Sequence, residues 1–341
     1  MSYMEATRRR VSLHNRTWPA FATGAGHVIQ LARNTWGTAA RCVTMALENR
    51  ERKSSVCRLF GMNAGRRTVR AEYWLADAPD SMLEQSRRNP DGSGIGWYEA
   101  DGKPRVDKQS AAAYADPEFE RTASRVTATT LVTHVRFATV GAHTVANTHP
   151  FRMRGRLMAH NGGFGDLDRV DQQLGPYRDL VLGQTDSERF AALICQQTDV
   201  HDGDVASGMV HAAKWLARNV PVSSLNCVVV SPGRMWALRY PDCRSLHVAT
   251  RSVCDGSREP GWSGRSRLAE HRIMGDPDGE STRVALVASE RIDGRDDWRQ
   301  LDPGELLYID EDLRVESHKA VEGPPEFPQP AGNSDPNDDS D

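Results

Sequence analysis

The strongest structural signal in the chain is a series of short β-branched runs, which a few helical segments interrupt. Residues 129–139 (TTLVTHVRFAT), 225–241 (LNCVVVSPGRMWALRYP) and 282–290 (TRVALVASE) have the composition of strands, and the second contains a Pro-Gly turn. Residues 186–197 and 206–219 instead place apolar residues at helical spacing. Strands in runs with inserted helices predict an α+β protein of packed layers, and several such arrangements are compatible with the pattern.

Charge and hydropathy argue against two classes of partner. The formal net charge over 341 residues is -3, which gives no electrostatic reason to expect nucleic acid or an anionic membrane surface. No run of about 18 uncharged apolar residues is present, so a membrane-spanning helix is not expected. We expect a cytoplasmic protein that uses no cofactor.

The cysteines single out one position. The chain has six cysteines and no CxxC pair, so a disulfide framework or a thiolate zinc site is poorly supported. In a reducing cytosol most of them are expected to be small buried residues. Cys57 differs, because it begins the strand-like run CRLFGMN directly after a segment of another character. It is the candidate for a chemical role.

Residues 1–56 form that preceding segment, with scattered positive charge and no sustained apolar period. A twin-arginine signal fits poorly, because Asn15, Arg16 and Pro19 break its apolar core. An Arg-rich transit peptide fits the composition better. The favoured origin is upstream sequence translated by mistake, since Val56 stands where an initiator would be and one valine codon is also a bacterial start codon. We expect residues 1–56 to be absent from the mature protein.

Two further groups of residues invite functional readings that the pattern does not favour. GSGIG at 92–96 follows a Pro-Asp turn and precedes a strand, whereas a phosphate-binding loop needs a strand before it and a helix after it. A hairpin entry is therefore predicted. The histidines at 134, 143, 149 and 160 lack the i, i+4 spacing of a helical metal-binding pair. Hydrogen-bonded core or turn histidines are favoured, and no metal site is expected.

Several motifs follow Cys57 in a fixed order. CRLFG is succeeded by NPDGSGIGWY, THVRFATVG, NTHPF, AHNGGF and TDSERF. Together they resemble the class II glutamine amidotransferase family of N-terminal-nucleophile hydrolases, and in particular its short stand-alone bacterial members such as the amidohydrolase of the ergothioneine pathway. The resemblance covers residues 57–318, where it implies a glutamine amidotransferase type 2 domain with a four-layer αββα sandwich of two mainly antiparallel sheets. The proline-rich, acidic residues 319–341 are expected to be disordered.

The chemistry of an N-terminal cysteine explains why Cys57 must be the first residue of the active chain. The α-amine of a chain that begins at Cys57 has an unperturbed pKa near 8 and can accept the thiol proton through a water molecule, and later return it to leaving ammonia. An amide nitrogen joined to Val56 is not a base. The extension should therefore abolish activity.

The resemblance also assigns roles to matching positions. It implies that Asn161 and Gly162 form the oxyanion hole, that Arg136 holds the substrate α-carboxylate, and that Asp186 pairs with the substrate α-ammonium. A planar guanidinium suits bidentate contact with a carboxylate. Read alone, Arg136 fits a strand-end salt bridge and Asp186 fits a helix N-cap.

The arginine motif departs from the pattern of synthase-linked relatives. Phe137 and Val140 stand where those relatives tend to have tryptophan and histidine, so the loops over the substrate are expected to differ. Thr139 and Gly141 are retained and are expected to line the pocket. His149, in NTHPF, is expected to be structural.

Two functions from different classes follow. The first is hydrolysis of the terminal amide of glutamine, or of a γ-glutamyl conjugate, through a γ-glutamyl thioester on Cys57. Free glutamine as the substrate would imply a separate ammonia-accepting synthase as partner, since no synthase domain is recognised in the chain. The alternative is a catalytically blocked glutamine-binding or regulatory protein that retains the extension.

Overall fold

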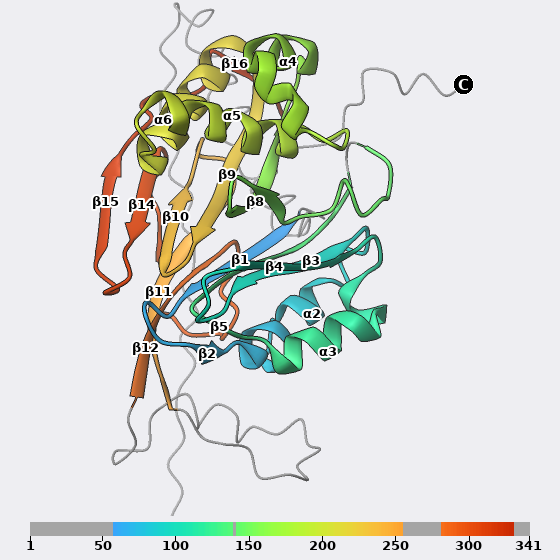
Figure 1. Cartoon of the computed structure of the whole chain (residues 1–341), viewed down its shortest axis with the longest axis vertical. Coiled ribbons are helices and arrows are strands. Elements are labelled where there is room, and N and C mark those ends of the chain that lie inside the picture. Colours follow the sequence, from blue (N-terminus) through green and yellow to red (C-terminus); the bar gives the residue numbers. More distant parts are fainter. Residues whose placement is uncertain (1–56, 139–140, 255–280, 331–341) are drawn as a thin grey trace, which may run out of the picture. The chain divides into compact units, whose positions relative to one another are not determined.

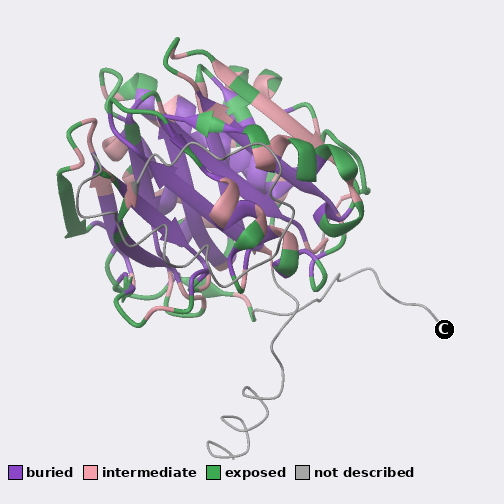
Figure 2. Cartoon of the chain, turned by 90° about the horizontal axis from the view of Figure 1, so that it is seen from below, coloured by how far each residue is buried: buried purple, intermediate pink, exposed green. Residues whose placement is uncertain are grey.

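The computed structural model of the chain describes residues 57–138, 141–254 and 281–330. Within these ranges two large sheets lie face to face, and helices cover the outer face of each (Figure 1). The strands of both sheets are largely buried, whereas exposed residues gather in loops and on the outer sides of the helices (Figure 2). No helix in the described ranges has the length and apolar character needed to cross a membrane.

The first sheet contains β1 at its centre, and all its neighbouring strands run antiparallel. Its described strands are, in spatial order, β13 (Arg299–Gln300), β11 (His247–Cys254), β12 (Ser281–Ala288), β1 (Arg58–Asn63), β6 (Thr130–Val135), β3 (Ser93–Tyr98) and β4 (Pro104–Gln109). The glycine-rich segment at 92–96 enters β3, so the predicted hairpin with β4 is confirmed.

The second sheet is antiparallel apart from one short strand. Its described order is β15 (Val315–Lys319), β14 (Glu305–Ile309), β10 (Arg234–Leu238), β9 (Pro221–Ser231), β8 (Arg156–Phe164) and β7 (Phe151–Met153). β16 (Phe327–Pro328) pairs in parallel with the start of β9. The predicted Pro-Gly hairpin is β9–β10. A separate small sheet joins β2 (Val69–Arg70) to β5 (Thr127–Ala128).

The alternation of β1 divides its side chains between two cores, as a strand with two covered faces requires. Leu59 packs between the sheets with residues such as Val228. Phe60 and Met62 point the other way, into the core beneath the helices of the first sheet. A Cβ at Gly61 would lie 2.8 Å from the Met235 sulfur, so glycine lets the sheets approach closely at this point.

Helices complete the outer layers. α5 (Asp186–Val200) and α6 (Val205–Asn219) cover the second sheet through a core that includes Phe190, Met209 and Leu216. The remaining described helices are α4 (Leu167–Leu174) and η3 (Gly175–Leu180) on that side, and η1 (Tyr73–Asp77), α2 (Met82–Gln85), η2 (Ala113–Ala115) and α3 (Pro117–Arg125) on the side of the first sheet. The expected four-layer αββα sandwich is thereby confirmed.

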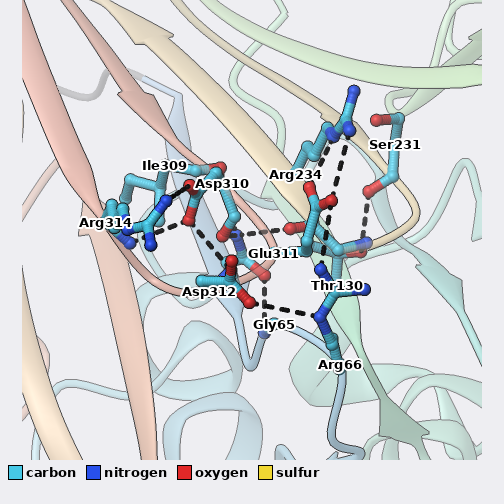
Figure 3. Close-up of polar contacts among 12 residues, drawn as sticks. Gly65, Arg66, Thr130, Ser231, Arg234, Ile309, Asp310, Glu311, Asp312 and Arg314 are labelled. Atoms are coloured by element: carbon cyan, nitrogen blue, oxygen red, sulfur yellow. Dashed lines mark hydrogen bonds and ion pairs between the residues drawn. The ribbon is translucent and has the colours of Figure 1, made fainter.

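A polar network anchors the end of β1 that lies away from Cys57. The buried Asn63 amide donates to the carbonyl oxygen of Gly233 at 3.0 Å and accepts from Gly65 N–H at 2.8 Å. Around it, the acidic turn that joins β14 to β15 forms ion pairs with Arg66 and Arg234 (Figure 3). The arginines of these ion pairs are exposed, so the pairs contribute little, whereas the Asn63 bonds are buried.

The expected disorder of residues 319–341 is wrong for residues 319–330. Val321 is buried, and Glu326 N–H donates to the carbonyl oxygen of Ala217 at 2.8 Å. Proline removes a backbone donor only at its own position, so residues between the prolines still pair with α6 and β9. Residues 331–341 and the extension 1–56 lie outside the described residues.

Candidate active site

Cys57 directly precedes β1, and the β1–β6 register brings it beside the residues that follow β6. The backbone N–H of Phe137 donates to Cys57 Sγ at 3.2 Å. The Phe137 carbonyl oxygen lies 3.3 Å from the same sulfur and accepts from the thiol. The residue is half-buried, so the sulfur is held in a fixed place without being sealed in the core.

The surroundings of the Cys57 thiol favour its protonated form. Burial raises the pKa of Cys57. The Phe137 amide and the positive charges of Arg244 and Arg136 act in the opposite direction and lower this pKa, but they do not outweigh burial. Because the thiolate is the nucleophilic form, this cysteine needs a base near neutral pH.

The side chains in the described ranges supply no base in hydrogen-bond contact with Cys57 Sγ. His160 is the titratable residue of the AHNGGF motif, but its Nε2 lies 3.0 Å from the Ser224 carbonyl and must donate to it. Its Nδ1 then accepts from the Ser187 hydroxyl at 2.9 Å. Burial lowers the pKa of His160 and keeps the ring neutral. His160 therefore joins β8 to α5 and β9 as a structural residue.

Asn161 and Gly162 lie on β8, in the sheet that faces Cys57. Asn161 Nδ2 donates to Ser289 Oγ at 3.4 Å, which leaves the second hydrogen of this amide for another acceptor. Ser289 Oγ also accepts from Leu59 N–H at 3.0 Å, so Asn161 and the start of β1 share one anchor. A Cβ at Gly162 would overlap the Ser224 carbonyl oxygen, and only glycine permits this approach of β8 to β9.

Arg136 follows β6 and is buried. Its guanidinium donates to the carbonyl oxygens of Gly141 and Ala142 at 3.2 and 3.3 Å. Burial lowers the pKa of Arg136, while the nearby Cys57, Asp91 and Asp186 raise it. Gly141 has φ +79° and so adopts a backbone conformation that favours glycine. Thr139 and Val140 lie outside the described residues.

Asp186 is the first residue of α5, and the residue that caps this helix is Thr185. The Thr185 hydroxyl accepts from Glu188 N–H at 3.2 Å, so the reading of Asp186 as the N-cap is wrong. Asp186 Oδ2 accepts from Phe164 N–H at 3.1 Å, and Oδ1 accepts from Ser187 N–H at 2.8 Å. These bonds fix the carboxylate beside the end of β8.

Sequence reasoning missed Asn147, which organises the loop beyond Arg136. Its Nδ2 donates to the Ala142 carbonyl at 2.9 Å, and its Oδ1 accepts from Gln184 N–H at 2.8 Å. It therefore ties the loop whose carbonyls hold Arg136 to the segment before α5. The asparagine of NTHPF is the signal that could have found it.

Ser289 and Arg244 were missed as well, and neither lies in a recognised motif. Ser289 follows β12, and Arg244 lies in the loop between β10 and β11. Arg244 Nη1 lies 3.5 Å from Asn161 Oδ1 and donates to it. Both residues reach the site through long-range strand order, which the sequence pattern does not specify.

His134 and His149 lie against each other as a tilted pair with ring centroids 4.1 Å apart, and Phe151 packs edge-on against His149 at 4.6 Å. The expected burial is confirmed. The ring nitrogens of His149 have no hydrogen-bond partner among the described residues, and those of His134 have only a weak contact with the His160 backbone. Ring packing takes the place of polar contacts. Burial lowers the pKa of His134 to about 3 and that of His149 well below its usual value. The described part of the chain contains no cluster of three metal-ligating side chains.

Known proteins resemble the chain over most of this fold. The sequence model of the family described as "Glutamine amidotransferases class-II" matches residues 56–324. The chain is 27% identical over 302 residues to "Probable glutamine amidotransferase DUG3" of Saccharomyces cerevisiae, covering 74% of this chain and 82% of that protein. It is 24% identical over 293 residues to the amidophosphoribosyltransferase of Synechococcus elongatus, covering 82% of this chain and 50% of that protein.

Solved structures extend the likeness to the fold. The glutamine aminotransferase class-II domain protein of Silicibacter pomeroyi superimposes with a TM-score of 0.52 at 19% identity, over 78% of this chain and 100% of that chain. The phosphoribosylpyrophosphate amidotransferase of B. subtilis does so with a TM-score of 0.54 at 19% identity, over 79% of this chain and 50% of that chain. The family match spans most of the sequence and includes Cys57, Arg136, Asn161 and Asp186. The chain belongs to the class-II glutamine amidotransferases.

Proposed function

We propose that the chain hydrolyses the γ-amide of glutamine, or of a γ-glutamyl conjugate, through a γ-glutamyl thioester on Cys57, and that the active form begins at Cys57. One observation supports this most. The Cys57 sulfur is held by Phe137 N–H at 3.2 Å, its pKa is raised, and no described side chain contacts it as a base. The α-amine of a chain that begins at Cys57 would supply the missing base from the same residue.

The reaction then proceeds in two steps, formation of the thioester and its hydrolysis. The α-amine takes the thiol proton through a water molecule, and the thiolate attacks the substrate γ-carbonyl carbon. The resulting oxyanion receives the second Nδ2 hydrogen of Asn161 and the backbone N–H of Gly162. The carbon–nitrogen bond breaks as the amine leaves with the proton from the α-ammonium. Water then attacks the thioester, releases glutamate and restores the thiol.

The two ends of the substrate amino acid have separate binding residues in this proposal. Arg136, kept in place by the carbonyls of Gly141 and Ala142, binds the α-carboxylate. Asp186, whose two oxygens are fixed by backbone N–H groups, binds the α-ammonium. Gly141 is proposed to line the pocket together with Thr139, which lies outside the described residues. If free glutamine is the donor, a separate ammonia-accepting synthase is the partner.

A substrate panel with the chain trimmed to Cys57 tests the proposal. Glutamine and γ-glutamyl conjugates are incubated with the enzyme, released ammonia or amine is measured, and acid-quenched enzyme is analysed by intact mass. The expected result is turnover of at least one compound, with a γ-glutamyl adduct that maps to Cys57. Turnover with an adduct on another residue, or no turnover of any compound, would refute the proposal.

A further inference from the structure

The Arg244 guanidinium lies beside the proposed oxyanion hole and has unused donors. Its Nη1 donates to Asn161 Oδ1 at 3.5 Å, which is a long bond for a charged donor. Its Nε is buried and has no hydrogen-bond partner within the described ranges. A buried donor without an acceptor costs free energy, so this position is one where an acceptor from outside the chain would be favourable.

Arg244 has no carboxylate partner within the described residues, unlike several buried arginines of the fold. The buried arginines at 58, 189, 239 and 251 each form an ion pair with an Asp or Glu. No described acidic side chain lies within ion-pair distance of Arg244, so its charge is not neutralised by the fold.

The backbone around Arg244 is firmly held. Its carbonyl oxygen accepts from Arg239 Nε at 2.8 Å and from Asn226 Nδ2 at 3.2 Å. The next residue, Ser245, donates through its hydroxyl to the Ser289 carbonyl at 2.8 Å. The base of the side chain is therefore fixed against the same Ser289 that anchors Asn161.

The position of Arg244 along β8 indicates which part of a substrate it would meet. Asp186 contacts β8 at Phe164, whereas Arg244 contacts it at Asn161. The two contacts are three residues apart along β8, on either side of its irregularity between Gly163 and Phe164. A γ-glutamyl group with its α-ammonium at Asp186 and its γ-carbonyl at Asn161 would direct the leaving amine beyond Asn161, toward Arg244.

We infer that Arg244 binds a carboxylate carried by the amine half of the substrate, so that the enzyme prefers γ-glutamyl amino acids to uncharged γ-glutamyl amides. This inference rests on the proposed function, because it takes Asn161 to mark the scissile carbonyl. The positive charge of Arg244 near the Cys57 thiol agrees with a place beside the reacting atoms.

Two substrates that differ only in one carboxylate test the inference. They are γ-glutamylglycine and γ-glutamylmethylamide, compared by kcat/KM in the wild type, in Arg244→Gln and in Arg291→Gln. Arg291 forms an exposed ion pair with Asp296 and is the matched control. The expected ratio of the two kcat/KM values is about 10- to 100-fold in favour of γ-glutamylglycine, the size of one charge-assisted contact. In Arg244→Gln the ratio falls to about 1, and in Arg291→Gln it is unchanged.

If the ratio of the two kcat/KM values stays the same in Arg244→Gln, the inference is overturned. This holds even if both kcat/KM values fall, because an equal fall means that Arg244 only positions Asn161. Binding of both compounds to the full chain with Cys57→Ala separates this result from failure of the proposed function. Carboxylate-dependent binding that is lost with Arg244→Gln, without hydrolysis by the parent enzyme, refutes the proposed function alone. Hydrolysis without any preference for the carboxylate refutes the inference alone.

Discussion

At the scale of single residues, Asn161 has two amide hydrogens and one known acceptor. Because Ser289 Oγ takes only one of them, Asn161→Ala is expected to remove an oxyanion donor and to lower kcat by about 10²–10³-fold, or about 3 kcal/mol of transition-state stabilisation. Steady-state kinetics measure the effect. Asn219→Ala, at the end of α6, is the control and should leave kcat unchanged. A loss confined to KM would contradict the oxyanion role.

Cys57 permits a second test at the same scale. Cys57→Ala is expected to abolish turnover while it preserves glutamine binding, because Arg136 and Asp186 are fixed by backbone groups and not by the thiol. Titration calorimetry reports the binding and ammonia release reports the turnover. Measurable turnover in this variant would show that another residue is the nucleophile.

At the scale of elements, the start of α5 contributes both to the stability of the fold and to the proposed binding site. The Thr185 hydroxyl caps the helix, and the next residue is Asp186. Thr185→Ala is expected to lower the free energy of unfolding by about 1 kcal/mol and also to lower substrate affinity, because the first turn carries the Asp186 carboxylate. Asp204→Ala removes the equivalent cap of α6, a helix that carries none of the proposed site residues.

Denaturant titration and substrate binding should separate these two variants. Both are expected to lose a similar free energy of unfolding, but only Thr185→Ala should lose affinity. If Asp204→Ala weakened binding as much, the cap of α5 would have no special connection to the site.

Also at this scale, the sequence allowed the strands and helices to be predicted better than their assembly. β6, β9, β10 and β12 appear as β-branched runs because strand composition is local. Which strands share a sheet depends on pairing between distant segments. β1 lies between β6 and β12, and even the nearer of these in sequence, β6, begins more than 65 residues after β1 ends. The placement of Ser289 and Arg244 follows from that order, so local pattern could not reveal it. β16 was missed because its prolines suggested disorder.

At the scale of the whole molecule, the buried histidine pair makes stability depend on pH. The pKa of His134 falls to about 3 in the folded chain, and that of His149 is also lowered, against about 6.5 in an unfolded chain. Below pH 6.5 the unfolded chain binds protons that the folded chain does not, so stability is fully present above pH 6.5 and is lost as the pH falls toward 3.

Denaturation at several pH values measures this dependence. His149→Gln is expected to make the loss shallower by about 1.4 kcal/mol per pH unit well below pH 6.5. His143→Gln, at an exposed histidine, is the control variant. An unchanged slope in His149→Gln would show that other groups cause the acid sensitivity.

The proposed reaction depends on the α-amine of Cys57 as the proton acceptor. The intact mass of the assayed protein, determined together with its amide hydrolysis rate, decides whether this amine is required. We predict that chains whose mass corresponds to a start at Cys57 turn over substrate, and that chains still carrying residues 1–56 are inert or only bind glutamine. Full turnover by a chain that retains Met1 would contradict the account, because the nitrogen of Cys57 would then be an amide.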